Sequence, residues 1–177
     1  MKNFSLKFLD IMIGLVLGLG FQWWPDLIEP WQFVVFVFVY LDIIDYWIDY
    51  GPSLKKFPPK FELDIFLDVG IMFALFLYIY STQLTVAYFL SAFILLRALD
   101  FFWLLRSKYE YHPVGIEGKY VNTWLRIDAF ECFFVGGIAW WSTFTTFNPL
   151  IMVIIFIAFR IIMRFIASLT YKKVSFI

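Results

Sequence analysis

The sequence contains very little of the cysteine and histidine on which many redox and metal sites depend. Its 177 residues include one cysteine, Cys132, and one histidine, His112. One cysteine cannot form a disulfide within the chain, and these two residues cannot make a zinc cluster, a haem pair or a histidine-based catalytic dyad. We therefore expect no resident cofactor, and we assign no catalytic residue.

The sequence also lacks an excess of charge of either sign. Its 14 basic and 14 acidic residues give a net charge of zero. Most of the basic residues lie in short connecting segments rather than in one patch. Proteins that bind nucleic acid usually carry a basic patch, so we expect no nucleic-acid partner.

Apolar residues, in contrast, dominate the composition. They make up 63% of the chain, whereas soluble domains are about 45–50% apolar. A membrane-spanning helix needs about 20 mostly apolar residues. Six stretches qualify, at about 7–24, 29–49, 63–81, 84–105, 122–142 and 148–170. We predict an all-α integral membrane protein, with one transmembrane domain of six helices over residues 1–177 and with membrane lipid around it.

The connections between these stretches alternate in charge. The segments 24–30, 81–85 and 142–149 contain no lysine or arginine, whereas segments 49–62 and 106–119 and both termini are basic. Basic connections favour the cytoplasmic side of a membrane. We therefore predict that both termini are cytoplasmic and that the helices form three antiparallel hairpins.

Charged residues recur at similar places in the three predicted hairpins. Each first helix carries an acid near its start, and each second helix carries a charge in its latter half. The six positions are Asp10, Asp68 and Asp128 on the first helices and Asp42, Arg97 and Arg160 on the second. The similar intervals suggest an internal triplication of one hairpin.

Ten charged side chains in the predicted helices are candidates for a site. Most of them lie three or four residues from another charge, a spacing that places both on one face of a helix. The predicted ion- or substrate-binding acids are Asp10, Asp42, Asp45, Asp68, Asp100, Asp128 and Glu131, and the predicted charge-pairing bases are Arg97, Arg160 and Arg164. With the predicted orientation, all ten belong to the cytoplasmic half of the membrane.

The energy of burial indicates that these side chains face the protein interior. At about 2.5–3.5 kcal/mol per charge, ten lipid-facing charges would cost on the order of 25–35 kcal/mol, more than the stability of a typical domain. The charges must therefore be paired, hydrated or protonated. Because seven acids accompany three arginines, we expect an acid-rich cavity that attracts cations.

Two functions follow from such a cavity. The first is a small transporter or channel-like protein that handles a cation, a proton or a cationic solute, with Asp42, Asp68 and Asp128 holding the ion. The second is a structural subunit of a membrane complex, in which an Asp/Arg network sets the register of the helices. The surplus of acids favours the first.

A third interpretation rests on Asp42, Asp45 and Asp49. Carboxylates at this spacing can hold Mg²⁺. The spacing resembles the aspartate-rich motif of intramembrane prenyltransferases, and Asp64 and Asp68 resemble a second acidic motif, although Leu41 stands where that family usually has an asparagine. The resemblance implies a Mg²⁺-dependent membrane prenyl or lipid transferase.

Two glycines on the first predicted helix suggest a place where another helix packs closely. Gly14 and Gly18 lie four residues apart, and small residues at this spacing let another helix approach closely. We expect a packing notch for a helix of the same chain, with a homo-oligomer or a partner subunit of a membrane complex as the alternative. Arg126 lies away from the face of Asp128, so we expect it outside the cavity.

Overall fold

The computed structural model describes residues 2–142, 144 and 148–170, with side chains described for 7–142, 144 and 148–169. The regular secondary structure of this part of the chain is entirely helical, with no strand. The α-helices are α1 (Lys2–Gly20), α2 (Pro30–Lys56), α3 (Glu62–Tyr80), α4 (Val86–Tyr111), α5 (Gly115–Ser142) and α6 (Pro149–Thr170). Two short 3₁₀ helices, η1 (Phe21–Asp26) and η2 (Ser81–Gln83), follow α1 and α3.

Five of the α-helices are long and apolar enough to cross a membrane. The sequence predicted six such helices, and α5 is the exception. Its 28 residues are sufficient in length, but Arg126, Asp128 and Glu131 interrupt its apolar stretch. Composition and length thus establish a membrane-like helical protein with five candidate spans.

Several helices extend beyond the predicted limits. Helix α2 continues past residue 49 to Lys56, and it includes Pro52. Helix α4 continues to Tyr111, and α5 begins at Gly115 rather than near residue 122. The predicted limits followed the apolar stretches, whereas backbone hydrogen bonding continues into the polar segments beyond them.

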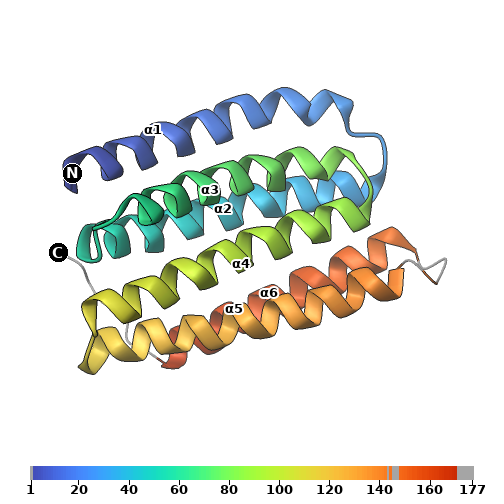
Figure 1. The fold of residues 1–177 in the computed structure, drawn as a ribbon. Helices are drawn as coiled ribbons and strands as arrows, with labels where there is room; N and C mark the ends of the chain where they lie inside the picture. Colours follow the sequence, from blue (N-terminus) through green and yellow to red (C-terminus); the bar gives the residue numbers. More distant parts are fainter. Residues whose placement is uncertain (1, 143, 145–147, 171–177) are drawn as a thin grey trace.

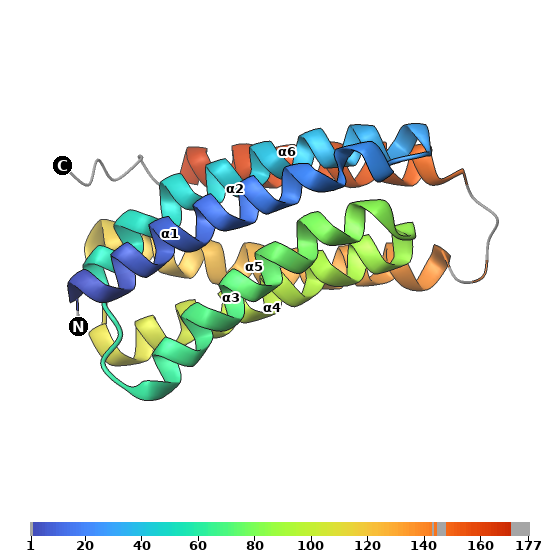
Figure 2. The ribbon, with the colours of Figure 1, turned by 90° about the horizontal axis from the view of Figure 1, so that it is seen from above.

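The helices run side by side along one long bundle (Figure 1). Helices α2 and α6 lie on one side, helices α3, α4 and α5 lie on the other, and α1 packs against both α2 and α3 (Figure 2). Helix α1 begins and α6 ends at the same end of the bundle (Figure 1). We call this the basic end, because the α2–α3 and α4–α5 connections with their flanking lysines also lie there, and we call the other the opposite end.

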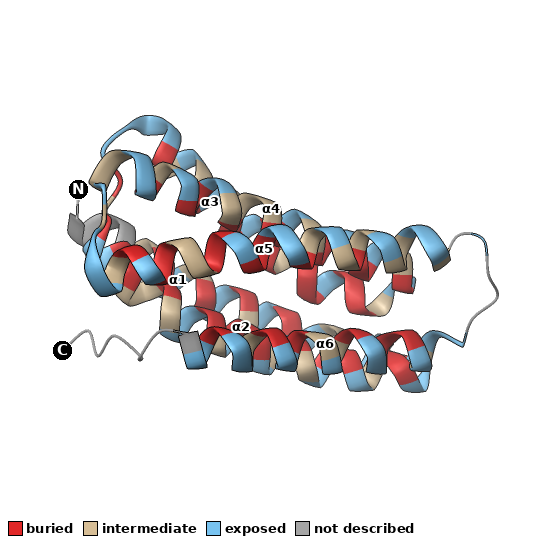
Figure 3. Ribbon diagram, turned by 90° about the horizontal axis from the view of Figure 1, so that it is seen from below, coloured by how far each residue is buried: buried red, intermediate tan, exposed pale blue. Residues whose placement is uncertain are grey.

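The outer faces of the bundle are apolar. Phe73 on α3, Phe133 on α5 and Ile161 on α6 are all more than half exposed. Figure 3 shows that the buried positions gather on the sides of the helices that face one another. Large exposed apolar surfaces are a liability in water, whereas lipid chains cover them without cost. The pattern agrees with the membrane-like composition.

Four aromatic side chains fill the core toward the opposite end. Tyr78, Phe89, Phe93 and Phe156 are fully buried, and we call them the aromatic layer. The Phe156 ring lies 4.8 Å from the Phe93 ring and 5.1 Å from the Phe89 ring, centroid to centroid. Because Arg97 and Arg160 follow Phe93 and Phe156 by four residues, the layer lies one helical turn from both arginines.

The expected packing notch at Gly14 and Gly18 is absent from the described structure. A Cβ atom at either position would meet no atom within 4 Å. The close approach on α1 occurs instead at Gly20, where a Cβ would lie 2.5 Å from Cδ1 of Ile79. The prediction failed because glycine spacing does not define how α1 is rotated about its axis.

Candidate functional site

Arg97 on α4 is the centre of a buried network of charges. Its side chain is 1% exposed. Four carboxylates from three helices lie within 4.0 Å of its guanidinium nitrogens. The nitrogen–oxygen distances are 4.0 Å to Asp42, 3.3 Å to Asp100, 3.6 Å to Asp128 and 3.3 Å to Glu131. One arginine therefore links α2, α4 and α5.

Arg160 adds α6 to the same network. Its Nε and Nη2 both lie 3.1 Å from Oδ1 of Asp42, and its Nη1 donates to Oε1 of Glu131 at 2.8 Å. Asp42 and Glu131 thus contact both arginines, whereas Asp100 and Asp128 pair with Arg97. We call these six residues the deep network.

Local spacing explains how so few helices supply so many charges. Arg97 and Asp100 lie three residues apart on α4, and Asp128 and Glu131 lie three apart on α5, so each pair shares a face. Helices α4 and α5 pack against each other extensively. Their two charged faces therefore meet.

The deep network contains more acids than bases. It holds four carboxylates and two guanidinium groups, and all six side chains are buried. If every group were ionised, the network would carry two unbalanced negative charges. Unbalanced buried charge is expensive, because the low-dielectric interior replaces water poorly. Arg97 and Arg160 alone therefore do not balance the four carboxylates of the deep network.

Asp128 is the least satisfied member of the deep network. It is fully buried, and neither of its carboxyl oxygens has a hydrogen-bond donor within the described residues. Its contact with Arg97, at 3.6 Å, is longer than a hydrogen bond. Asp100 differs, because it accepts hydrogen bonds from the Tyr46 hydroxyl at 3.2 Å and from Nη1 of Arg97 at 3.3 Å.

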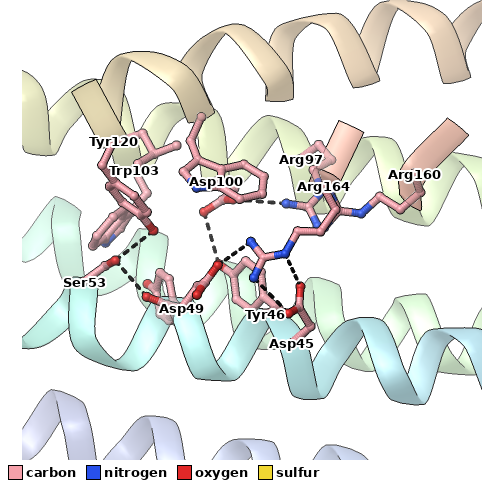
Figure 4. Close-up of a pocket in the computed structure, with 13 residues that line it drawn as sticks. Asp45, Tyr46, Asp49, Ser53, Arg97, Asp100, Trp103, Tyr120, Arg160 and Arg164 are labelled. Carbon is pink, nitrogen blue, oxygen red and sulfur yellow. Dashed lines mark hydrogen bonds and ion pairs between the residues drawn. The ribbon is translucent and has the colours of Figure 1, made fainter. Parts of the chain in front are cut away.

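A second cluster surrounds Arg164, one turn nearer the basic end. Arg164 donates to both oxygens of Asp45, at 2.7 and 2.8 Å, and also pairs with Asp49. These groups are partly open to solvent, with 22% of the Arg164 side chain and 39% of the Asp45 side chain exposed. Figure 4 shows Arg164 reaching from α6 to the two acids on α2.

We expect the Arg164 cluster to contribute little to stability. Partly exposed ion pairs are screened by water, so Arg164→Gln should lower the free energy of unfolding by about 1 kcal/mol or less. Denaturant unfolding in detergent micelles measures this change. A loss as large as that expected for a buried arginine would contradict the description of this cluster as partly open to solvent.

A cavity of about 30 Å³ separates the Arg164 cluster from the deep network. The hydroxyl-bearing residues Tyr46, Tyr50, Ser53 and Tyr120 line it together with Asp100, and Figure 4 shows Tyr46, Ser53, Tyr120 and Asp100 around it. A buried water needs roughly 10–15 Å³ measured this way. The cavity therefore has room for about two waters but not for an organic solute.

Two of the ten predicted residues lie outside both groups. Asp10 is exposed and accepts a hydrogen bond from Nε1 of Trp47 at 3.1 Å. Asp68 is buried and accepts a hydrogen bond from the Tyr50 hydroxyl at 2.7 Å. Asp42, Arg97 and Arg160, the charges of the predicted second helices, all lie in the deep network. Of the acids on the predicted first helices, Asp128 lies there too, whereas Asp10 and Asp68 do not.

The Arg126 expectation is confirmed. Its side chain is exposed on α5, outside the deep network. The cost of burying a cation without partners explains why the one arginine on the far face of α5 points away from the bundle.

The three acids proposed for Mg²⁺ are divided between two arginines. Asp42 pairs with Arg160, whereas Asp45 and Asp49 pair with Arg164. Within the described residues, no group of three or more acids, histidines or cysteines is placed to hold a metal ion. The arrangement therefore gives the transferase interpretation no support.

The second acidic motif also has other partners. Asp64 accepts backbone hydrogen bonds from Lys60 and Phe61 at 3.0 and 2.8 Å, which caps the start of α3. Its other oxygen accepts hydrogen bonds from Arg106 at 3.0 and 3.1 Å.

The charge pattern did not reveal the tyrosines of the site. Tyr46, Tyr50 and Tyr78 donate to Asp100, Asp68 and Asp42, respectively. A signal was available for the first two, because Asp42, Tyr46 and Tyr50 follow one another at intervals of four on α2 and therefore share a face. Tyrosines in a chain this rich in aromatic residues are more simply read as core or interface residues.

Comparisons of the chain with models of known protein families, with curated proteins and with solved structures found no match.

Proposed function

We propose that this protein is a small membrane transporter or channel-like protein that binds protons in the deep network, with access from the basic end. Asp128 carries the proposal, because a fully buried carboxyl group that receives no hydrogen bond from the described residues is far more stable neutral than charged. A proton on Asp128 removes one of the two excess charges. The other excess negative charge is offset by a second proton or a small cation that Asp42, Asp100 and Glu131 share.

Size favours a proton over a larger solute. The cavity beside Asp100 has a volume of about 30 Å³. Arg160 nitrogens also hold Oδ1 of Asp42 and Oε1 of Glu131, so each of these acids has only its second oxygen left for a metal cation. Protons, in contrast, move along water and hydroxyl groups and need no larger opening.

The proposal includes a membrane topology. Helix α5 crosses the membrane with the others, because Asp128 and Glu131 face the two arginines while Phe130 and Phe133 are exposed to lipid. The helices form three antiparallel hairpins, and both termini are cytoplasmic because the basic end faces the cytoplasm. The aromatic layer then closes the path toward the outer side.

Reconstituted vesicles test this function. Purified protein in liposomes containing a pH-sensitive dye should dissipate an imposed pH gradient faster than protein-free liposomes do. The infrared spectrum of the protein should also contain a protonated carboxyl band at neutral pH. Folded protein that neither moves protons nor shows this band would refute the proposal.

A structural role is the second candidate, and the pairing of charges across helices favours it. Arg97 and Arg160 together contact carboxylates from α2, α4 and α5, so they also define how those helices are rotated. Folded protein without proton flux, in which the network is essential only for folding, would indicate a subunit of a membrane complex.

A further inference from the structure

We propose that Tyr46 passes protons from the hydroxyl-lined cavity to Asp100, and so controls how fast the deep network gains and loses them. This inference rests on the proposed proton-binding function and adds a route to it. Tyr46 lines the cavity, and its hydroxyl donates to Oδ1 of Asp100 at 3.2 Å. Asp100 lines the same cavity, and the Tyr46 hydroxyl already hydrogen-bonds the oxygen of Asp100 that a proton from the cavity would reach.

Asp100 lies between Tyr46 and the unsatisfied Asp128. Its Oδ2 contacts Nη1 of Arg97 at 3.3 Å, and the same nitrogen lies 3.6 Å from Oδ1 of Asp128. The two acids thus approach one guanidinium nitrogen from different helices. A proton on Asp100 therefore shares a guanidinium nitrogen with Asp128, the carboxyl group that receives no hydrogen bond from the described residues.

The other walls of the cavity carry further hydroxyl groups. The hydroxyls of Ser53 and Tyr120 lie 2.9 Å apart, and Ser53 also donates to the backbone oxygen of Asp49. These residues lie toward the basic end relative to Asp100. The charged and titratable groups that line the cavity are Asp45, Asp49, Asp100, Arg97, Arg160, Arg164, Tyr46, Tyr50 and Tyr120.

Tyr50 supports the route without replacing Tyr46. Its ring stacks on that of Tyr46 with centroids 5.1 Å apart, but its own hydroxyl donates to Asp68. Arg97 also packs over the Tyr46 ring, at 5.8 Å from its centroid. The ring of Tyr46 is thereby held, and its hydroxyl remains directed at Asp100.

The proton transfer is balanced at the tyrosine. The Tyr46 O–H bond breaks as a new O–H bond forms on Oδ1 of Asp100. At the same time the phenol oxygen takes a proton from a cavity water, which takes one in turn from solvent. Tyr46 is neutral before and after the transfer, and Asp100 changes from carboxylate to carboxylic acid.

A pH-jump experiment on Tyr46→Phe tests the route. The ring is retained and the hydroxyl is lost, so proton uptake, followed as the rate of change of the infrared carboxyl band in detergent-solubilised protein, should slow about 100-fold, the lower range for a positioned proton-transfer group. The final amplitude of the band should be unchanged. The matched control is Tyr40→Phe on the same helix, whose hydroxyl donates to the backbone oxygen of Leu17; it should behave as wild type.

The outcomes separate the route from the function. An unchanged uptake rate in folded Tyr46→Phe would overturn the route while leaving proton binding intact. Absence of a carboxyl band in wild-type protein would instead overturn the proposed function. If Tyr46→Phe does not fold, difluorotyrosine at position 46, which retains the shape and alters the acidity of the hydroxyl, should change the rate, and an unchanged rate would again overturn the route.

Discussion

Asp128→Asn is expected to abolish proton movement through the protein while leaving it folded. The amide occupies the same space as the carboxyl group but cannot exchange a proton in the physiological range. Because Asp128, which has no hydrogen-bond donor within the described residues, carries a proton in the proposed resting state, the neutral amide should leave the charge balance and the fold intact. We expect proton flux in vesicles to fall about 100-fold or more, as for the loss of a positioned acid–base group.

The matched control for this variant is Asp26→Asn. Asp26 is exposed at the end of η1, at the opposite end of the bundle from the cavity, and the change in chemistry is the same. Its proton flux should equal that of wild type. Wild-type flux in a folded Asp128→Asn protein would show that Asp128 does not carry the proton.

Arg97→Gln is expected to cause the largest loss of stability of any substitution in the network. It removes the cation that four buried carboxylates face and leaves them beside one another. Breaking a buried charge pair from one side typically costs about 3–5 kcal/mol. Denaturant unfolding in detergent micelles should show a decrease of this size, several times that expected for Arg164→Gln.

A second substitution makes the electrostatic cause testable. In the double variant Arg97→Gln/Asp100→Asn one of the acids that Arg97 had paired is neutral, so part of the lost stability should return. Arg126→Gln is the control, because Arg126 lies exposed on α5 and its replacement should change stability by no more than about 0.5 kcal/mol. If the double variant is no more stable than Arg97→Gln, lost packing rather than unpaired charge explains the effect.

These two variants also distinguish the candidate functions. If the network binds protons, the Asp128→Asn variant should fold but should not move protons. A purely structural network requires Asp128 for folding, because its charge would then be part of the balance around Arg97. Stability and flux must therefore be measured on the same preparations.

The helices and their polar segments could be predicted from local sequence. The apolar stretches identified all six helices, and five of them satisfy the requirements for a membrane span. The limits were less accurate at the basic end, where α2 continues seven residues beyond the predicted residue 49 to Lys56. Hydropathy measures which side chains avoid water, and it is insensitive to backbone hydrogen bonds that continue into a polar segment.

By itself, the sequence determined that the chain is helical, that most of it is suited to a membrane, and which charges share a helix face. Those properties depend on residues three or four positions apart, so they are readable along the chain. The tertiary structure decided which acid meets which arginine and that Asp10 and Asp68 lie apart from the deep network. It also decided that Tyr46 reaches Asp100 and that no donor among the described residues reaches Asp128. Such contacts depend on how each helix is rotated about its axis against its neighbours, and packing between distant segments sets that rotation.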